Sequence, residues 1–157
     1  MLGANASTVI AGNSGAVEFQ GNTAATNTKL RAQGGGTLKF SGAATASGAS
    51  ITVDGGTSSF DATGITSGKD DFAIGTLSGN GQVNMGGTRL NLTGGDSTFS
   101  GVISGTNGLR YNGTGTLTLS GANTFTGNIG LISGTVSVSS DAALGGNGSG
   151  LILMVAR

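Results

Sequence analysis

The side chains that most often perform catalysis or bind metals are scarce in this chain. It contains no histidine and no cysteine among its 157 residues. A Ser-His-Asp triad, a Cys-His pair and a zinc site of the usual kind are therefore excluded. What remains is the chemistry of paired carboxylates, which glycosidases hold about 5–9.5 Å apart. The chain has seven acidic residues for such a pair: Glu18, Asp54, Asp61, Asp70, Asp71, Asp96 and Asp141.

Two pairs of these carboxylates are close in the sequence. Asp54 and Asp61 flank the Gly55-Gly56 turn, where aspartate is common for turn geometry alone. Asp70 and Asp71 are adjacent, so they would point to opposite faces of a strand, and Lys69-Asp70-Asp71 predicts a solvated loop. We therefore expect no catalytic, cofactor-binding or metal-binding residue and no enzyme. The alternative is a carbohydrate-binding or polysaccharide-cleaving β-helix enzyme, which requires acids of neighbouring coils to converge in a groove with basic residues.

The composition excludes further classes of function. The formal net charge is zero and only 9% of residues are charged, so no basic excess exists to neutralise a nucleic-acid backbone. The start, Met1 to Asn5, has neither a basic region nor an apolar run, so no signal peptide is expected there. The apolar stretch 151–156 is far shorter than the roughly 20 residues of a membrane helix. We expect no membrane insertion, and we expect the chain to be a piece of a longer protein.

The elements that must position these side chains are short strands. An apolar-x-apolar pattern, usually followed by glycine, recurs along the chain with starts at Val17, Leu38, Phe60, Leu90, Leu117 and Val136. Alternation of this kind is typical of half-buried strands, and a repeat period of about 20–50 residues is typical of solenoids. The sequence therefore predicts an all-β, parallel β-solenoid of five or six irregular coils of about 20–30 residues. An antiparallel sandwich is less consistent with strands that repeat in one direction.

Stacking of coils also predicts which residues lie above one another. If each strand pairs with its equivalent one period later, Leu117 lies over Leu90 and Leu119 over Leu92. Apolar ladders would then line the interior, with threonine and serine outside. We expect one domain over 1–157, in which 151–157 is either an apolar tail or a last strand. A third interpretation is a disordered or aggregation-prone fragment, because open coil ends are templates for pairing.

One stretch resembles a known family. It reads Gly115-Thr-Leu-Thr-Leu-Ser-Gly-Ala-Asn-Thr-Phe-Thr-Gly127, followed by Gly134-Thr-Val-Ser-Val138 and preceded by a glycine-rich lead from Phe99 to Leu109. With these residues, 88–141 resembles the passenger-associated transport repeat of bacterial autotransporters. The rest of the chain resembles this repeat only in style.

The resemblance carries expectations about fold and function. It implies a right-handed parallel β-helix from a passenger region that is displayed at the bacterial surface, held at the outer membrane or secreted. The implied role is structural, as a stalk or adhesin-like segment that aids export and folding, in a class of proteins associated with virulence. Host surfaces, glycans or further repeats of the same chain are the partners expected, and no cofactor is implied.

Overall fold

The computed structural model describes residues 8–67 and 70–154, and in these residues the protein is a parallel β-solenoid of about seven turns. The one helix described is a short 3-10 helix, η1 (Asp141–Leu144). The fifteen strands are β1 (Thr8–Ala11), β2 (Ala16–Phe19), β3 (Lys29–Ala32), β4 (Thr37–Gly42), β5 (Ser50–Val53), β6 (Ser59–Ile65), β7 (Phe72–Ile74), β8 (Thr76–Gly79), β9 (Gln82–Asn84), β10 (Leu90–Leu92), β11 (Ser97–Phe99), β12 (Val102–Ser104), β13 (Leu109–Leu119), β14 (Ile129–Val138) and β15 (Leu151–Leu153).

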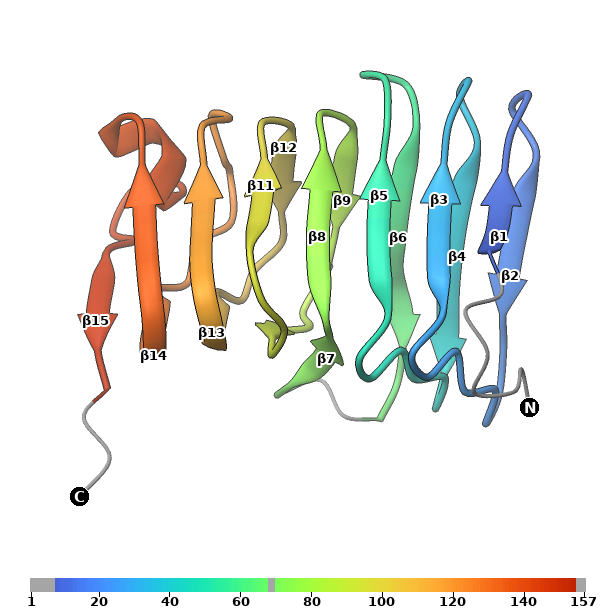
Figure 1. Cartoon of the computed structure of the whole chain (residues 1–157), viewed down its shortest axis with the longest axis horizontal. Coiled ribbons are helices and arrows are strands. Elements are labelled where there is room, and N and C mark those ends of the chain that lie inside the picture. Colours follow the sequence, from blue (N-terminus) through green and yellow to red (C-terminus); the bar gives the residue numbers. More distant parts are fainter. Residues whose placement is uncertain (1–7, 68–69, 155–157) are drawn as a thin grey trace.

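The strands form three faces around a narrow interior (Figure 1). Face A contains β1, β3, β5, β8, β11 and the second halves of β13 and β14, and face B contains β2, β4, β6, β9 and β12. Face C contains β7, β10, the first halves of β13 and β14, and β15. The nearer strands of face A run upward in Figure 1, those of face B run downward behind them, and the chain advances from right to left. This arrangement is a right-handed solenoid, so the predicted fold class is confirmed.

Every recorded strand pair is parallel and joins consecutive coils, but the predicted register was wrong. Leu90 pairs with Leu109 and Leu92 with Tyr111 on face C, whereas Leu117 pairs with Ser97 and Leu119 with Phe99 on face A. The series through Val17, Leu38 and Phe60 does stack on face B, and its next member is Val83 rather than Leu90. The error arose because strands of all three faces share one apolar-x-apolar pattern. Solenoid turns also proved more numerous than the five or six predicted.

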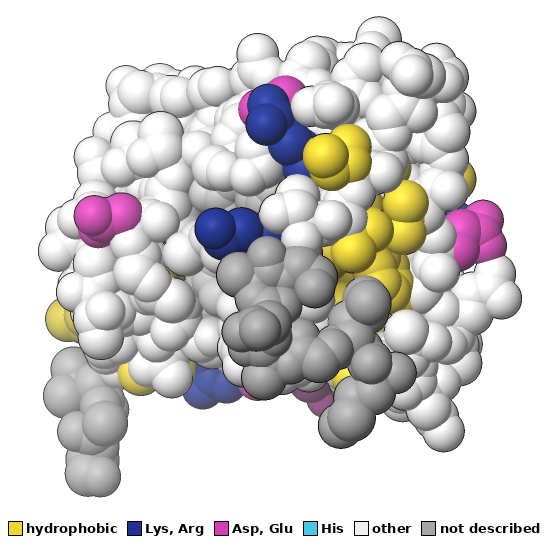
Figure 2. All heavy atoms as spheres, turned by 45° about the vertical axis from the view of Figure 1, so that its right-hand side comes forward, with side chains coloured by type: hydrophobic (Ala, Val, Ile, Leu, Met, Phe, Trp, Pro, Cys, Tyr) yellow, Lys and Arg dark blue, Asp and Glu magenta, His cyan; other side chains and the backbone are white. Residues whose placement is uncertain are grey.

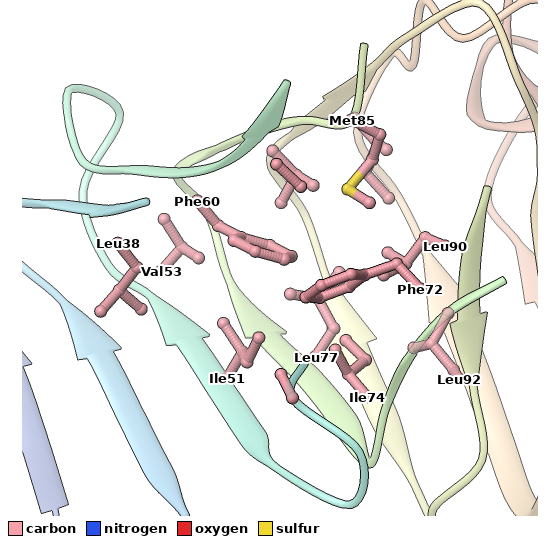
Figure 3. Packing of buried hydrophobic residues seen from close by; sticks show 14 of the residues in the cluster. Leu38, Ile51, Val53, Phe60, Phe72, Ile74, Leu77, Met85, Leu90 and Leu92 are labelled. Carbon is pink, nitrogen blue, oxygen red and sulfur yellow. The ribbon is translucent and has the colours of Figure 1, made fainter. Parts of the chain in front are cut away.

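The interior is a continuous column of apolar side chains. Leu38, Ile51, Phe60, Leu77 and Leu90 are all fully buried, and Figure 3 shows such residues from different coils meeting between the faces. Four phenylalanines pack together in the first half: Phe19 stacks on Phe40 at 4.6 Å between ring centroids, and Phe40 also contacts Phe60 and Phe72 edge-on. Offset and edge-on pairs of this kind add to the free energy gained by burial.

Glycines form ladders where the chain turns between faces. A Cβ on Gly121 would overlap the carbonyl oxygen of Gly101, and a Cβ on Gly101 would overlap that of Gly81. Gly75, Gly94 and Gly113 form a second ladder of the same kind. These corners stack with backbone on backbone, so only a residue without a side chain fits. The ladders explain why glycine recurs about once per coil after the apolar pattern.

The two ends of the solenoid expose apolar side chains. Ile10 of β1 is half exposed, and Figure 2 shows hydrophobic side chains gathered at the end where β1 and β2 lie. At the other end β15 pairs with β14 as a last strand, yet Leu151, Ile152 and Leu153 remain largely exposed. In the part that the structure describes, no helix is both long and apolar enough to cross a membrane.

Candidate functional site

The stretch Gly115–Gly127 contains the end of β13 on face A and the corner of the solenoid that follows it. Leu117 and Leu119 of β13 are fully buried on face A, and Gly121 belongs to the first glycine ladder. Beyond this corner, Thr124–Thr126 lie outside any strand. They still follow the coil below, since the Thr124 N–H donates to the Ile103 carbonyl at 2.9 Å.

Asn123 holds this corner to the coils on either side. Its side chain is buried, its Oδ1 accepts from the Ile103 N–H at 2.9 Å, and its Nδ2 donates to the Ala143 carbonyl at 2.7 Å. Its own backbone N–H donates to the Ala142 carbonyl at 2.9 Å. Asn123 therefore connects β12 to η1. Its side chain satisfies backbone groups that would pair with a neighbouring strand in a regular parallel ladder. Asn123 belongs to the repeat motif, but its contacts are with residues about 20 positions away, so the local sequence does not predict them.

The first pair of candidate acids is not brought into one groove. Asp54 directly follows β5 and forms an exposed ion pair with Arg31 at 2.6 Å. Asp61 lies on face B, where its Oδ1 accepts from the Thr63 N–H at 2.9 Å. The groove that Asp61 lines has a volume of about 390 Å³, and the other residues lining it are Ser59, Gln82, Asn84, Val102 and Ser104. This groove offers hydrogen-bonding groups and one carboxylate.

The loop predicted at Lys69-Asp70-Asp71 agrees with Asp70 and Asp71, which lie outside any strand, but Asp71 is less solvated than predicted. Lys69 lies outside the described residues, and Asp70 is exposed. Asp71, just before β7, is two-thirds buried between two arginines: its Oδ1 lies 3.0 Å from Arg89 Nε and its Oδ2 lies 2.7 Å from Arg110 Nη1. The three residues come from three successive coils, so the cluster links β7, β10 and β13 on face C.

A sequence signal for this cluster did exist. Asp71 and Arg89 directly precede the strand partners Phe72 and Leu90, so they occupy equivalent positions in neighbouring coils. Arg110 lies one coil further on, where it is the register partner of Asn91. Glu18 and Lys39 are register partners on β2 and β4, and they also form an ion pair, at 3.6 Å. Residues of opposite charge that are about one coil length apart in the sequence therefore indicate contacts between neighbouring coils.

A second groove opens beside the Asp71–Arg89–Arg110 cluster. It has a volume of about 280 Å³, and its polar lining includes both arginines together with Asn107 and Asn128. Ile152 and Met154 form an apolar wall at the C-terminal side. Among the described residues there is no group of three or more acids that would hold a metal ion.

Among the described residues, Tyr111 is the one side chain whose pKa the fold clearly displaces. Its ring is fully buried against the bare backbone of Gly113 and Gly134, and its hydroxyl donates to the Gly95 carbonyl at 3.0 Å. Burial raises the pKa of the phenol above its usual 10.0, the Gly115 backbone N–H opposes this, and the Asp96 carboxylate adds to it. The phenol is therefore held neutral and hydrogen-bonded within the packed interior.

Comparison with known proteins agrees with the motif. No curated protein and no solved structure matches the chain. The family described as the passenger-associated-transport-repeat matches at residues 30–57 and 109–138. Both matches begin on a buried leucine, and each extends beyond the residue that pairs with this leucine on the next coil. Leu30 pairs in this way with Ile51, and Leu109 pairs with Ile129. Two stretches of the solenoid, one in each half of the described chain, are therefore similar to the passenger-associated transport repeat.

Proposed function

We propose that this segment is a structural part of an autotransporter passenger, displayed at the bacterial surface or released from it. The observation that carries the proposal is the repeat match at 109–138, which coincides with the two longest strands of the solenoid. The motif residues have structural roles there: Gly121 permits close stacking and Asn123 joins three coils. A rod of stacked parallel coils supports a stalk or adhesin-like role.

The coil stack also supports a role in export. Each coil pairs in register with the one before it, so a folded coil is a template for the next. Folding that starts at one end would hold the exported part outside and prevent its return. We expect β13 and β14 to fold first, because they are the two longest strands and their pairing has the most register partners, in spite of two register shifts.

Surface display can be tested in the cell that produces the protein. An epitope inserted between Asn147 and Gly148, at an exposed turn, would be labelled by antibody on intact cells and removed by added protease. A periplasmic protein that stays protected provides the control for cell integrity. Labelling only after lysis would contradict the proposal.

The folding order has a separate test. Pulse-labelled hydrogen exchange during refolding should protect amides of β13 and β14 before those of β3 and β5. Simultaneous protection of all coils would remove the support for folding from one end, while leaving the surface role unaffected.

Polysaccharide cleavage is not part of the proposal. The groove on face B contains Asp61 and no second carboxylate among the described residues that line it. Both mechanisms of glycoside hydrolysis by paired acids need two.

A further inference from the structure

We propose that the groove beside the Asp71–Arg89–Arg110 cluster binds the carboxylate of an acidic sugar, such as a uronic acid residue of a glycan. The groove lies on the outside of face C, because Arg110 pairs in register with Gly130, and Gly130 with Ile152. Four coils contribute to it, from Arg89 to Met154. A partly open groove on a surface-displayed rod is accessible to a glycan, so the inference rests on the proposed surface role.

The cluster has more positive charge and more donors than Asp71 uses. Two guanidinium groups face one carboxylate, which leaves one positive charge. Arg89 donates to Asp71 from Nε, and Arg110 donates from Nη1. Each guanidinium has five N–H donors in a planar fork, so terminal N–H groups of both remain available within the described residues. A second carboxylate matches the planar fork of these donors.

The remaining lining fits hydroxyl groups and the apolar side of a sugar ring. Asn128 uses its Oδ1 to accept from the Gly150 N–H at 3.1 Å, and its Nδ2 has no recorded partner among the described residues. Gly127 and Gly130 leave part of the lining without side chains, while Ile152 and Met154 supply C–H surface. Polar groups placed around a partly apolar cleft are typical of small-molecule sites.

The size of the groove limits the ligand to about one sugar unit. Its volume of about 280 Å³ lies just below the range of about 300–1,000 Å³ that is usual for drug-sized ligands. A longer glycan would place its neighbouring units outside the groove, over the exposed strands of face C. Binding by one unit is expected to be weak, with a dissociation constant of about 1 mM.

The experiment uses the purified chain and glucuronate, with glucose and acetate as matched probes. Titration followed by NMR of the arginine Nε–H signals should shift those of Arg89 and Arg110 with glucuronate. Glucose lacks the carboxylate and acetate lacks the ring, so each should bind at least about tenfold more weakly. If either acetate or glucose binds as tightly as glucuronate, the assignment to an acidic sugar is overturned. Tighter binding of an acetylated dipeptide would assign the groove to a peptide terminus instead.

Two variants locate the site. Arg89→Gln should weaken glucuronate binding by about tenfold, because it removes one guanidinium fork. Gly130→Ala should also weaken it without removing either arginine, since the nearest atoms to a Cβ there are at the flexible end of Met154, at 3.1–3.2 Å, followed by a main-chain oxygen at 3.9 Å. The control is Arg31→Gln, which removes an arginine with the same kind of aspartate partner on face A.

An equal loss in Arg31→Gln and Arg89→Gln would show binding to exposed arginines in general and would overturn the proposal. So would the absence of binding by the folded chain at about 20 mM glucuronate. Neither result bears on surface display, which the epitope experiment measures in cells.

Discussion

Arg110 Nη1 lies 2.7 Å from Asp71 Oδ2, although 39 residues and two turns of the solenoid separate them. The arginine side chain reaches from β13 past Asn91 of β10 to the coil beyond. Arg89 contacts the other carboxylate oxygen, so one aspartate links three coils. This cluster is the most buried charge arrangement among the recorded ion pairs, and it leads to the first prediction.

Asp71→Asn should lower the free energy of unfolding by about 1–2 kcal/mol, because it leaves two arginines facing each other without their shared anion. The estimate is kept small because about a third of each side chain is exposed. Urea unfolding measures the difference, which should shrink in about 1 M NaCl. The matched control is Asp54→Asn in the exposed pair with Arg31, which should cost about 0.5 kcal/mol or less. Equal effects of the two variants would contradict a linking role for Asp71.

The glycine ladder gives the second prediction. Gly101→Ala places a methyl group against the Gly81 carbonyl and 2.8 Å from Phe99 Cζ, where backbone must move to accept it. We expect a loss of about 2–3 kcal/mol or more in unfolding free energy, as for an overpacked core. Gly56→Ala is the control, because a Cβ there has no atom within 4 Å. If both variants unfold at the same urea concentration, the coils do not stack as closely as described.

Asn123 gives the third prediction. Asn123→Ala leaves the Ile103 N–H and the Ala143 carbonyl without their partners in a buried corner. The expected loss is about 2–4 kcal/mol, since each unsatisfied buried group costs about 1–3 kcal/mol. Amides of η1 should also exchange faster with solvent, because the helix loses its attachment to β12.

The side chain at 123 can be tested further with two comparisons. Asn123→Asp keeps an acceptor for the Ile103 N–H, but its ionised carboxylate is buried and faces the Ala143 carbonyl, so at neutral pH it should be at least as destabilising as Asn123→Ala. Asn22→Ala, at an exposed turn, should change stability by less than about 0.5 kcal/mol. If the Asn123→Ala protein is as stable as the Asn22→Ala protein, Asn123 does not hold the corner to the neighbouring coils.

The fourth prediction concerns Tyr111 and alkaline pH. The pKa of its phenol is raised in the folded protein, so folding favours the protonated form. Its contribution is therefore complete below the unfolded pKa of 10.0 and is lost as the pH rises from there through the folded pKa. Tyr111→Phe should cost about 1 kcal/mol at neutral pH, where it loses the hydrogen bond to Gly95, and less at about pH 11.

Two measurements check this prediction. Unfolding free energies of both proteins against pH should converge above about pH 10, since all other groups titrate alike in the two. Tyr111 is the single tyrosine and no tryptophan is present, so tyrosinate absorbance reports its ionisation alone. A phenol that titrates in the folded chain at or below 10.0 would show that it is not shielded as described.

The sequence by itself determined the class of fold. Short alternating strands, glycine at each corner and a repeat period in the solenoid range are local properties, and they lead to stacked parallel coils before any contact is known. The resemblance carried by Gly115–Gly127 and Gly134–Val138 likewise depends on residues close in the chain, and the family match at 109–138 agrees with it. The earlier match at 30–57 has fewer of these signature residues and was not distinguished from the surrounding repeats.

Only the tertiary structure decided which coil residues meet. Leu90 lies on Leu109 and not on Leu117, because three faces share one pattern and corners of different length shift the strands from face to face. The same uncertainty concealed the cluster of Asp71, Arg89 and Arg110, whose members are local neighbours only after the coils have closed. A period of two specifies which side of a strand faces inward, but the stacking partner depends on the summed length of strands and corners around one full turn.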